Sequence, residues 1–141
     1  MSYELNLERK LNVPPTKAFE AWTGKDQLSA WWGMADDWQT TVVEVDLKEG
    51  GRYRLGMRDP GGDEHIVGGE YKKVIEGKLV EYTWKWEHGE NTTLVRVEFI
   101  PDGDGCLLKL NHSAFVETEH RDKHNEGWGG CVNQFTKFLD Q

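Results

Sequence analysis

The sequence predicts an α+β protein in which a curved antiparallel sheet of six to seven strands packs against one long C-terminal helix. Apolar and polar residues alternate over residues 3–11 and through most of residues 40–112, which is typical of half-buried strands. Short turns rich in glycine, proline and aspartate separate the later strands, and short connections favour antiparallel neighbours. From about Glu117 onward the apolar residues take helical spacing instead.

The first strand is predicted over residues 3–11, where tyrosine and leucine alternate with charged or polar side chains. The pair Pro14-Pro15 ends this strand and opens a helix, because proline is tolerated in a first helical turn. That helix passes through Trp22, and Gly24 separates it from a second short helix around residues 27–32.

Most of residues 40–112 are predicted to be strands joined by turns. The clearest strand runs from Val80 to Trp86, with valine, tyrosine and two tryptophans on one face and charged side chains or threonine on the other. Residues 64–74 are extended as well, but their mixed pattern leaves the buried face open. A sheet with one apolar face must bury that face against another element, and the C-terminal helix is the long element that the sequence offers.

The C-terminal helix is predicted to begin near Glu117, with Thr118 as its N-cap. At 100° per residue, four apolar side chains fall within about 60° of Trp128. They are Cys131, Val132, Phe135 and Leu139. His124 falls about 40° from Trp128 on the same face, so this face is apolar after Trp128 and polar before it.

Three glycines interrupt this helix, although each costs roughly 0.5–1 kcal/mol relative to alanine. Gly127 borders the apolar face, and two interpretations of it stay open. Its missing side chain either lets a strand or a bulky tryptophan approach the helix, or leaves room for a ligand beside His124 and Trp128. Gly129 and Gly130 point sideways and outward, where close contact with the short helices or with a partner is one explanation.

Length, charge and cysteine content restrict the function. A chain of 141 residues is expected to form a single domain over residues 1–141. A net charge of −8 argues against nucleic-acid binding. A membrane-spanning helix needs about 18 consecutive apolar residues, and no apolar run in the sequence approaches this length. The N-terminus lacks a signal-peptide pattern. We therefore expect a cytoplasmic protein in which Cys106 and Cys131 are buried thiols, with a disulfide as the lesser alternative.

Six segments carry a resemblance to a known family. They are, in order, PPTKAFEAWTGKDQLSAWWG, GGRYRLGMRDPGG, GGEYKKV, KLVEYTWKW, TLVRVEFIPDGDGCLLKLNHSAF and GWGGCVNQFTKFL. In this order they resemble the SRPBCC proteins related to the activator of heat-shock protein 90 ATPase. The resemblance extends from about residue 12 to residue 140.

The resemblance implies the helix-grip fold of the START superfamily, in which an antiparallel sheet grips the C-terminal helix around a hydrophobic cavity. It implies a range of functions, since members of this superfamily bind lipids, hormones and polyketides, and some catalyse cyclisation or hydrolysis. The nearest members include the chaperone activator, antibiotic self-resistance proteins and stand-alone domains without known activity. The fold alone therefore does not decide the function.

The leading hypothesis is a protein that binds a small apolar ligand, aromatic or lipid-like, in a cavity between the sheet and the C-terminal helix. Polar anchors are expected from His112, His124 and a tryptophan indole. The residues expected to line this pocket are Trp32, Tyr53, Met57, Tyr71, Trp84, Trp86, Val97, Leu110, His112, His124, Gly127, Trp128 and Val132.

Two other functions stay open. One is an interaction module that acts on a chaperone or another protein, as the resemblance implies. The other is a cyclase or hydrolase with His112 or His124 as general base, but no complete catalytic set is visible in the sequence, so we expect no enzyme. His120 and His124 have the spacing of some zinc ligands, yet His120 lies about 80° from Trp128. We therefore expect neither a metal nor another cofactor. The protein is expected to be a monomer or a homodimer.

Overall fold

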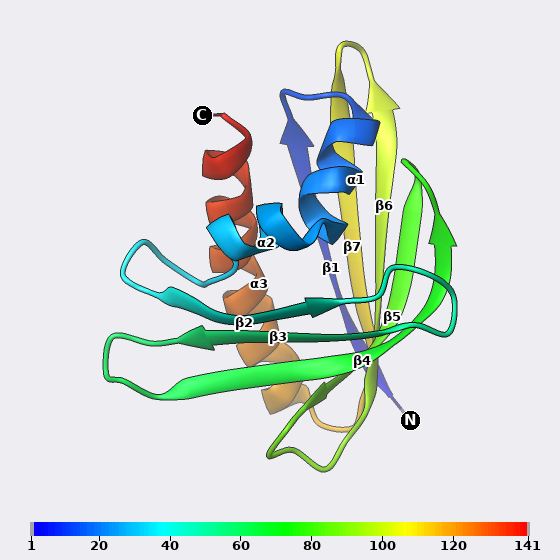
Figure 1. The fold of residues 1–141 in the computed structure, drawn as a ribbon. Coiled ribbons are helices and arrows are strands. Elements are labelled where there is room, and N and C mark those ends of the chain that lie inside the picture. The colour runs from blue at the N-terminus through cyan, green and yellow to red at the C-terminus, as the bar shows by residue number, and fades with distance from the viewer. Residues whose placement is uncertain (1, 141) are drawn as a thin grey trace.

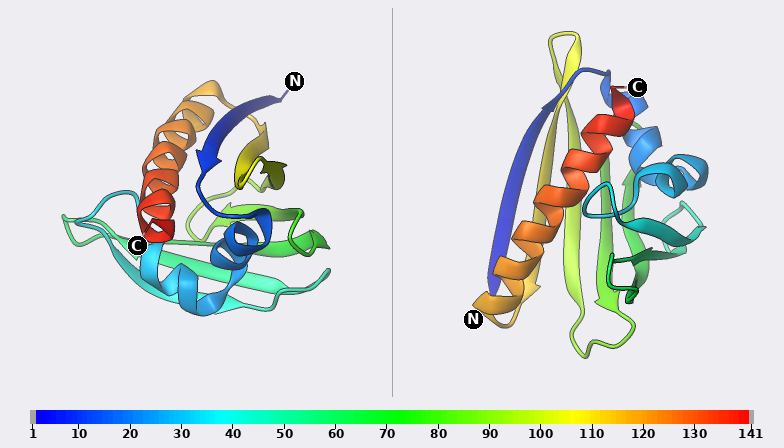
Figure 2. Two further views of the ribbon diagram at one scale, coloured as in Figure 1. Left: turned by 90° about the horizontal axis from the view of Figure 1, so that it is seen from above. Right: turned by 90° about the vertical axis from the view of Figure 1, so that its left-hand side faces the viewer.

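The computed structural model describes residues 2–140. Within that range, one curved sheet of seven strands wraps around the long helix α3 (Figures 1 and 2). The strands are β1 (Tyr3–Leu11), β2 (Gln39–Val45), β3 (Arg52–Arg58), β4 (Glu64–Ile75), β5 (Leu79–Trp86), β6 (Thr93–Asp102) and β7 (Gly105–Phe115). The helices are α1 (Pro15–Thr23), α2 (Lys25–Trp31) and α3 (Thr118–Leu139).

The strands lie in the order β1-β7-β6-β5-β4-β3-β2, and every neighbouring pair is antiparallel. From β2 to β7 each strand pairs with the next one along the chain, while β1 pairs with β7 at the far edge. Because α1 and α2 connect β1 to β2, they carry the chain from one edge of the sheet to the other (Figure 1). The predicted antiparallel sheet, short helix pair and C-terminal helix are confirmed.

Alternation along the strands decides which side chains enter the core. On β6, Val95, Val97 and Phe99 are at most 2% exposed. Arg96 lies between them in sequence and faces outward. Its Nη1 is 3.6 Å from Oε2 of Glu81 on the neighbouring strand β5. The inner face of the sheet is therefore apolar and the outer face carries ion pairs that solvent weakens.

Strand β4 buries the face that the mixed pattern of residues 64–74 leaves undecided. Val67, Gly69 and Tyr71 are its buried positions. A Cβ at Gly69 would lie 2.0 Å from the carbonyl oxygen of Thr83 on β5. Glycine therefore lets β4 approach β5 closely at the centre of the sheet.

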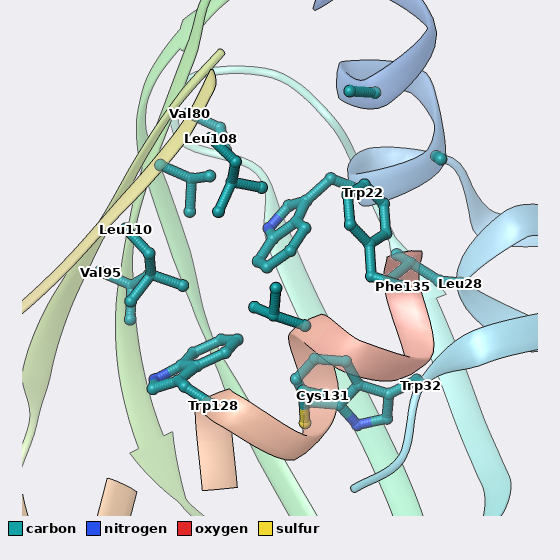
Figure 3. Packing of buried hydrophobic residues seen from close by; sticks show 14 of the residues in the cluster. Trp22, Leu28, Trp32, Val80, Val95, Leu108, Leu110, Trp128, Cys131 and Phe135 are labelled. Atoms are coloured by element: carbon teal, nitrogen blue, oxygen red, sulfur yellow. The ribbon is translucent and has the colours of Figure 1, made fainter. Parts of the chain in front are cut away.

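An aromatic cluster fills the hollow of the sheet around the C-terminal half of α3. Trp22 of α1 stacks on Trp128 of α3 with ring centroids 5.9 Å apart and meets Phe135 edge-on at 5.0 Å (Figure 3). The ring centroids of Trp31 on α2 and Phe135 are 4.8 Å apart. Trp22 also donates its indole N–H to the Tyr82 hydroxyl at 3.2 Å. The later part of α3 is therefore core, as its apolar spacing predicts.

The N-cap of helix α3 lies one residue before the predicted position. Thr118 is the first helical residue, and Glu117 holds the N-cap position with extended backbone angles and no side-chain capping bond. The capping role predicted for Thr118 is therefore wrong. Although α3 has 22 residues, no helix in the described range is long and apolar enough to cross a membrane.

Candidate functional site

A pocket of about 280 Å³ opens beside the N-terminal half of α3. Its walls come from α3, the end of β5, strands β3 and β4, and the loop at residues 32–38. The lining residues are Trp32, Met34, Met57, His65, Trp84, Trp86, Lys123, His124, Gly127, Trp128 and Cys131. The pocket thus lies where the inner face of α3 changes from polar to apolar.

Seven of the predicted pocket residues meet in this lining. They are Trp32, Met57, Trp84, Trp86, His124, Gly127 and Trp128. The centre of the group is the contact between β5 and α3, where the ring centroids of Trp84 and Trp128 are 5.0 Å apart. The alternation of β5 and the helical spacing of α3 are the two patterns that identify most of these residues.

Five other predicted residues lie outside the lining, in the core. Val97, Leu110 and Val132 are at most 1% exposed. Tyr53 and Tyr71 border a separate gap of about 10 Å³ that Trp22 also lines. The pocket includes only part of the predicted lining, because Trp22 of α1 fills the space beneath the middle of α3 (Figure 3).

His112 on β7 is also absent from the lining, although it faces inward as predicted. It is fully buried, and both ring nitrogens are hydrogen-bonded. The indole N–H of Trp128 donates to Nδ1 at 3.0 Å. The neutral ring therefore carries its proton on Nε2 and donates it to Thr93 Oγ1 at 2.6 Å. The Thr93 hydroxyl donates in turn to the carbonyl oxygen of Trp84 at 3.2 Å, so His112 ties α3 to two strands.

The charge state of His112 links the fold to pH. Burial, with a smaller contribution from the nearby His124, lowers the pKa of His112 to about 2. In an unfolded chain the same imidazole titrates near pH 6.5. Because the unfolded state binds a proton that the folded state excludes, stability is present above about pH 6.5 and falls as the pH is lowered.

His124 does line the pocket, but its ring nitrogens are engaged as well. The indole N–H of Trp86 donates to Nε2 at 2.9 Å, and Nδ1–H donates to the carbonyl oxygen of His120 at 2.7 Å. Burial lowers the pKa of His124 too. A general base needs a free lone pair within reach of the substrate proton. In this arrangement His112 and His124 would each have to lose an indole partner first.

Four lining residues are absent from the sequence prediction: Met34, His65, Lys123 and Cys131. Lys123 lies four residues before Gly127, so helical spacing could have identified it. Cys131 is on the apolar face of the helix, where the pattern indicates core. Met34 belongs to an irregular loop and His65 to the strand of mixed pattern, so only the tertiary structure brings these two into the site.

The mouth of the pocket carries polar groups. His65 Nε2 lies 2.9 Å from Asp59 Oδ2, and the bond from His65 lowers the pKa of Asp59. The His65 ring packs against Trp38 with centroids 5.7 Å apart. On the α3 side, Lys123 Nζ lies 3.2 Å from Glu119 Oε1. Polarity is therefore concentrated at the rim, while the interior is aromatic and sulfur-rich.

Two of the three glycines in α3 make room for the loop at residues 32–38. A Cβ at Gly130 would lie 2.3 Å from the carbonyl oxygen of Met34, and a Cβ at Gly127 would lie 3.1 Å from its Cε. Gly127 therefore lets the Met34 side chain approach the helix, in place of the strand or tryptophan expected, and it also lines the pocket. A Cβ at Gly129 would meet nothing within 4 Å.

The Cys131 thiol in the pocket wall is unreactive because it is buried and protonated. Cys131 is 3% exposed, and burial raises its pKa to about 12, so it stays protonated. Cys106 on β7 is buried too, and both cysteines are free, which confirms the predicted buried thiols. Among residues 2–140, no group of three histidine, cysteine or acidic side chains is placed to hold a metal ion.

The curved sheet wrapped around a C-terminal helix, with an aromatic pocket between them, defines a helix-grip protein of the START type. A family model described as Activator of Hsp90 ATPase homolog 1-like protein matches residues 12–140. The chain belongs to this family. A comparison with curated proteins found no match.

Solved structures share the fold at low sequence identity. A protein from Chromobacterium violaceum is 20% identical with a TM-score of 0.88, covering 98% of this chain and 97% of the other. The AHSA1 protein from Silicibacter pomeroyi is 24% identical with a TM-score of 0.88, covering 98% of each chain. An AHSA1-like protein from Aeromonas hydrophila is 22% identical with a TM-score of 0.81, covering 98% and 92%. At these identities the similarity establishes the fold.

Proposed function

We propose that this protein binds a small, mostly apolar ligand, aromatic or lipid-like, in the pocket beside α3. The observation that carries the proposal is an open space of about 280 Å³ in the middle of the most aromatic region of the chain. Four of the seven tryptophans line it. Other hollows on the described chain are larger, at about 440–570 Å³, so it is the aromatic lining of this pocket, rather than its size, that supports an occupant.

The volume limits the size of the ligand. Pockets for drug-sized molecules measure roughly 300–1,000 Å³, and this pocket, at about 280 Å³, lies just below that range. A ligand of one or two fused rings, or a short acyl chain, fits this volume better than a steroid or a full lipid. The polar rim formed by His65 and Lys123 would hold the polar end of such a ligand toward solvent.

We propose binding without catalysis. His112 and His124 use both ring nitrogens in hydrogen bonds within the protein, and the thiol of Cys131 is protonated at neutral pH. The sequence alternative of a cyclase or hydrolase with a pocket histidine therefore receives little support from this geometry.

The test is a binding titration with a variant that fills the pocket. Native mass spectrometry of the purified protein would reveal a retained ligand, and tryptophan fluorescence would follow titration with the two-ring compound 2-acetylnaphthalene. Gly127→Leu places a side chain in the pocket wall, whereas Gly129→Leu places the same side chain where a Cβ meets nothing within 4 Å. We expect saturable quenching that weakens at least tenfold in Gly127→Leu and persists in Gly129→Leu. Absence of saturable binding in the unmodified protein would refute the proposal.

The family description favours a second candidate, an interaction module that stimulates a chaperone ATPase of the Hsp90 type. This function would use the outer surface, so filling the pocket should not affect it. Adding the protein to a purified Hsp90 ATPase tests it directly. Stimulation that is equal for the unmodified protein and Gly127→Leu would support the module and separate it from ligand binding.

A further inference from the structure

Two indole N–H groups in the pocket wall have no hydrogen-bond partner. They are Nε1 of Trp32 and Nε1 of Trp84. The two side chains are 3% and 4% exposed, so solvent does not serve these donors. The third unpartnered buried polar side-chain atom in the described range is Thr41 Oγ1, outside the pocket lining. In Figure 3 the Trp32 nitrogen lies on the ring edge that points away from Trp22 and Phe135.

An unpartnered buried donor needs an explanation, because nearly all such groups in folded proteins are satisfied. The neighbouring rings offer only weak acceptors: Trp32 and Trp84 meet at a centroid distance of 6.1 Å and an interplanar angle of 63°. Contacts of an N–H with an aromatic face are of second order compared with a bond to oxygen. Both nitrogens belong to residues that line the pocket, but the atoms themselves are buried, so an acceptor reaches them once the two indole rings shift to admit it.

The interior of the pocket offers no comparable acceptor of its own. The lone pair at Nε2 of His124 already receives the Trp86 N–H, and Nδ1 of His112 receives the Trp128 N–H. The sulfur atoms of Met34, Met57 and Cys131 are weak acceptors. Among the described lining residues, the strong hydrogen-bonding groups left free inside the pocket are thus both donors.

We propose that the ligand is a small aromatic or otherwise planar molecule that carries a carbonyl-type oxygen at its buried end, received by the indole N–H groups of Trp32 and Trp84. This inference rests on the proposed ligand-binding function and adds the chemistry of recognition to it. A ketone, aldehyde, ester or carboxylate oxygen accepts hydrogen bonds without demanding an acceptor in return. An alcohol or amine would bury an N–H or O–H that finds no strong partner there.

A pair of compounds with the same shape tests this directly. 2-Acetylnaphthalene carries a C=O group where 2-isopropenylnaphthalene carries a C=CH2 group. A pocket without available donors prefers the alkene, because the ketone loses its bonds to water without replacement. If the two indoles receive the oxygen, we expect the ketone to bind tighter, by about fivefold for one engaged donor and about 25-fold for both.

Three variants locate the effect. Trp84→Phe and Trp32→Phe keep an aromatic ring but remove a free N–H, and each should reduce the preference for the ketone. Trp31→Phe is the matched control, since it removes an indole N–H that is already bonded, to the carbonyl oxygen of Ala21, outside the pocket lining. Tryptophan fluorescence still reports binding in each variant because six tryptophans of the original seven remain.

The outcomes separate this inference from the proposed function. Saturable binding of both compounds with equal or stronger affinity for the alkene would overturn the carbonyl inference and leave ligand binding intact. A ketone preference that survives in both Trp84→Phe and Trp32→Phe would also overturn it. Failure of both compounds to bind the unmodified protein would contradict the proposed function itself, and this inference with it.

Discussion

Two neighbouring glycines of α3 should respond in opposite ways to alanine. Gly129 and Gly130 both lie in the interior of the helix. A Cβ at Gly129 would meet nothing within 4 Å, whereas a Cβ at Gly130 would lie 2.3 Å from the carbonyl oxygen of Met34. The pair therefore isolates the contact between α3 and the loop at residues 32–38 from the general effect of glycine on a helix.

The magnitudes follow from these distances. Alanine in a helix interior is favoured over glycine by roughly 0.5–1 kcal/mol, and Gly129→Ala should show this gain. At Gly130 the new methyl group would also lie 3.2 Å and 3.3 Å from the carbonyl carbon and Cα of Met34, which are backbone atoms that cannot rotate away. Overpacking typically costs about 1–3 kcal/mol. Taking the upper end, the net loss for Gly130→Ala is about 2 kcal/mol, and the two variants differ by about 3 kcal/mol.

Urea unfolding followed by tryptophan fluorescence measures both variants on one scale. For a chain of this length, a change of 1 kcal/mol moves Tm by about 2–4 °C, so thermal melts should place the two variants roughly 6–12 °C apart. A Gly130→Ala protein as stable as Gly129→Ala would refute the reasoning. It would show that the loop does not rest on α3 as the structure places it.

Three further predictions concern the core and its histidines. From pH 7.5 to 5.0, His112 alone should remove about 2 kcal/mol from the free energy of unfolding, because its unfolded ring takes up a proton and its folded ring does not. Urea unfolding should show a flatter pH profile in His112→Gln and an unchanged one in the exposed control His88→Gln; equal profiles for all three proteins would contradict the assignment. Phe135→Ala should cost about 3–5 kcal/mol in the same assay, since the ring is fully buried, and a loss below about 1 kcal/mol would argue against this packing. Trp86→Phe should raise the pKa of His124 in an NMR titration, because the lost N–H donates to the neutral ring; an unchanged pKa would exclude that bond.

The strands and the long helix are predictable from sequence because each follows one local periodicity. The inward positions of β5, such as Trp84, and the apolar positions of α3, such as Trp128, result from repeats of two and 3.6 residues. These two patterns alone bring together most of the predicted pocket residues. The same reasoning correctly turned His112 toward the inside of the sheet.

Periodicity shows which residues face inward, but it does not show whether an inward residue lines a cavity or is covered by other side chains. A residue on the inner face lines a cavity or lies in packed core according to what approaches it from elsewhere in the chain. His112 is covered because Trp128 of α3 packs against its ring and bonds to it. Likewise Met34 reaches the pocket through a loop whose position depends on Gly130, nearly a hundred residues later. Such contacts depend on tertiary packing, so the sequence prediction placed core residues in the pocket lining and missed part of its rim.

The abundance of tryptophan has a chemical explanation in this site. Tryptophan is the aromatic side chain that donates a hydrogen bond and accepts none. Trp86 and Trp128 use that donor to occupy the lone pairs of His124 and His112, which keeps both imidazoles neutral and bonded. Phenylalanine in either place would leave an imidazole lone pair without this partner, and tyrosine would add a hydroxyl acceptor. Four tryptophans around one pocket therefore set its polarity as well as its shape: two donate to histidines, and the other two have no partner among the described residues and, on our proposal, bind a ligand.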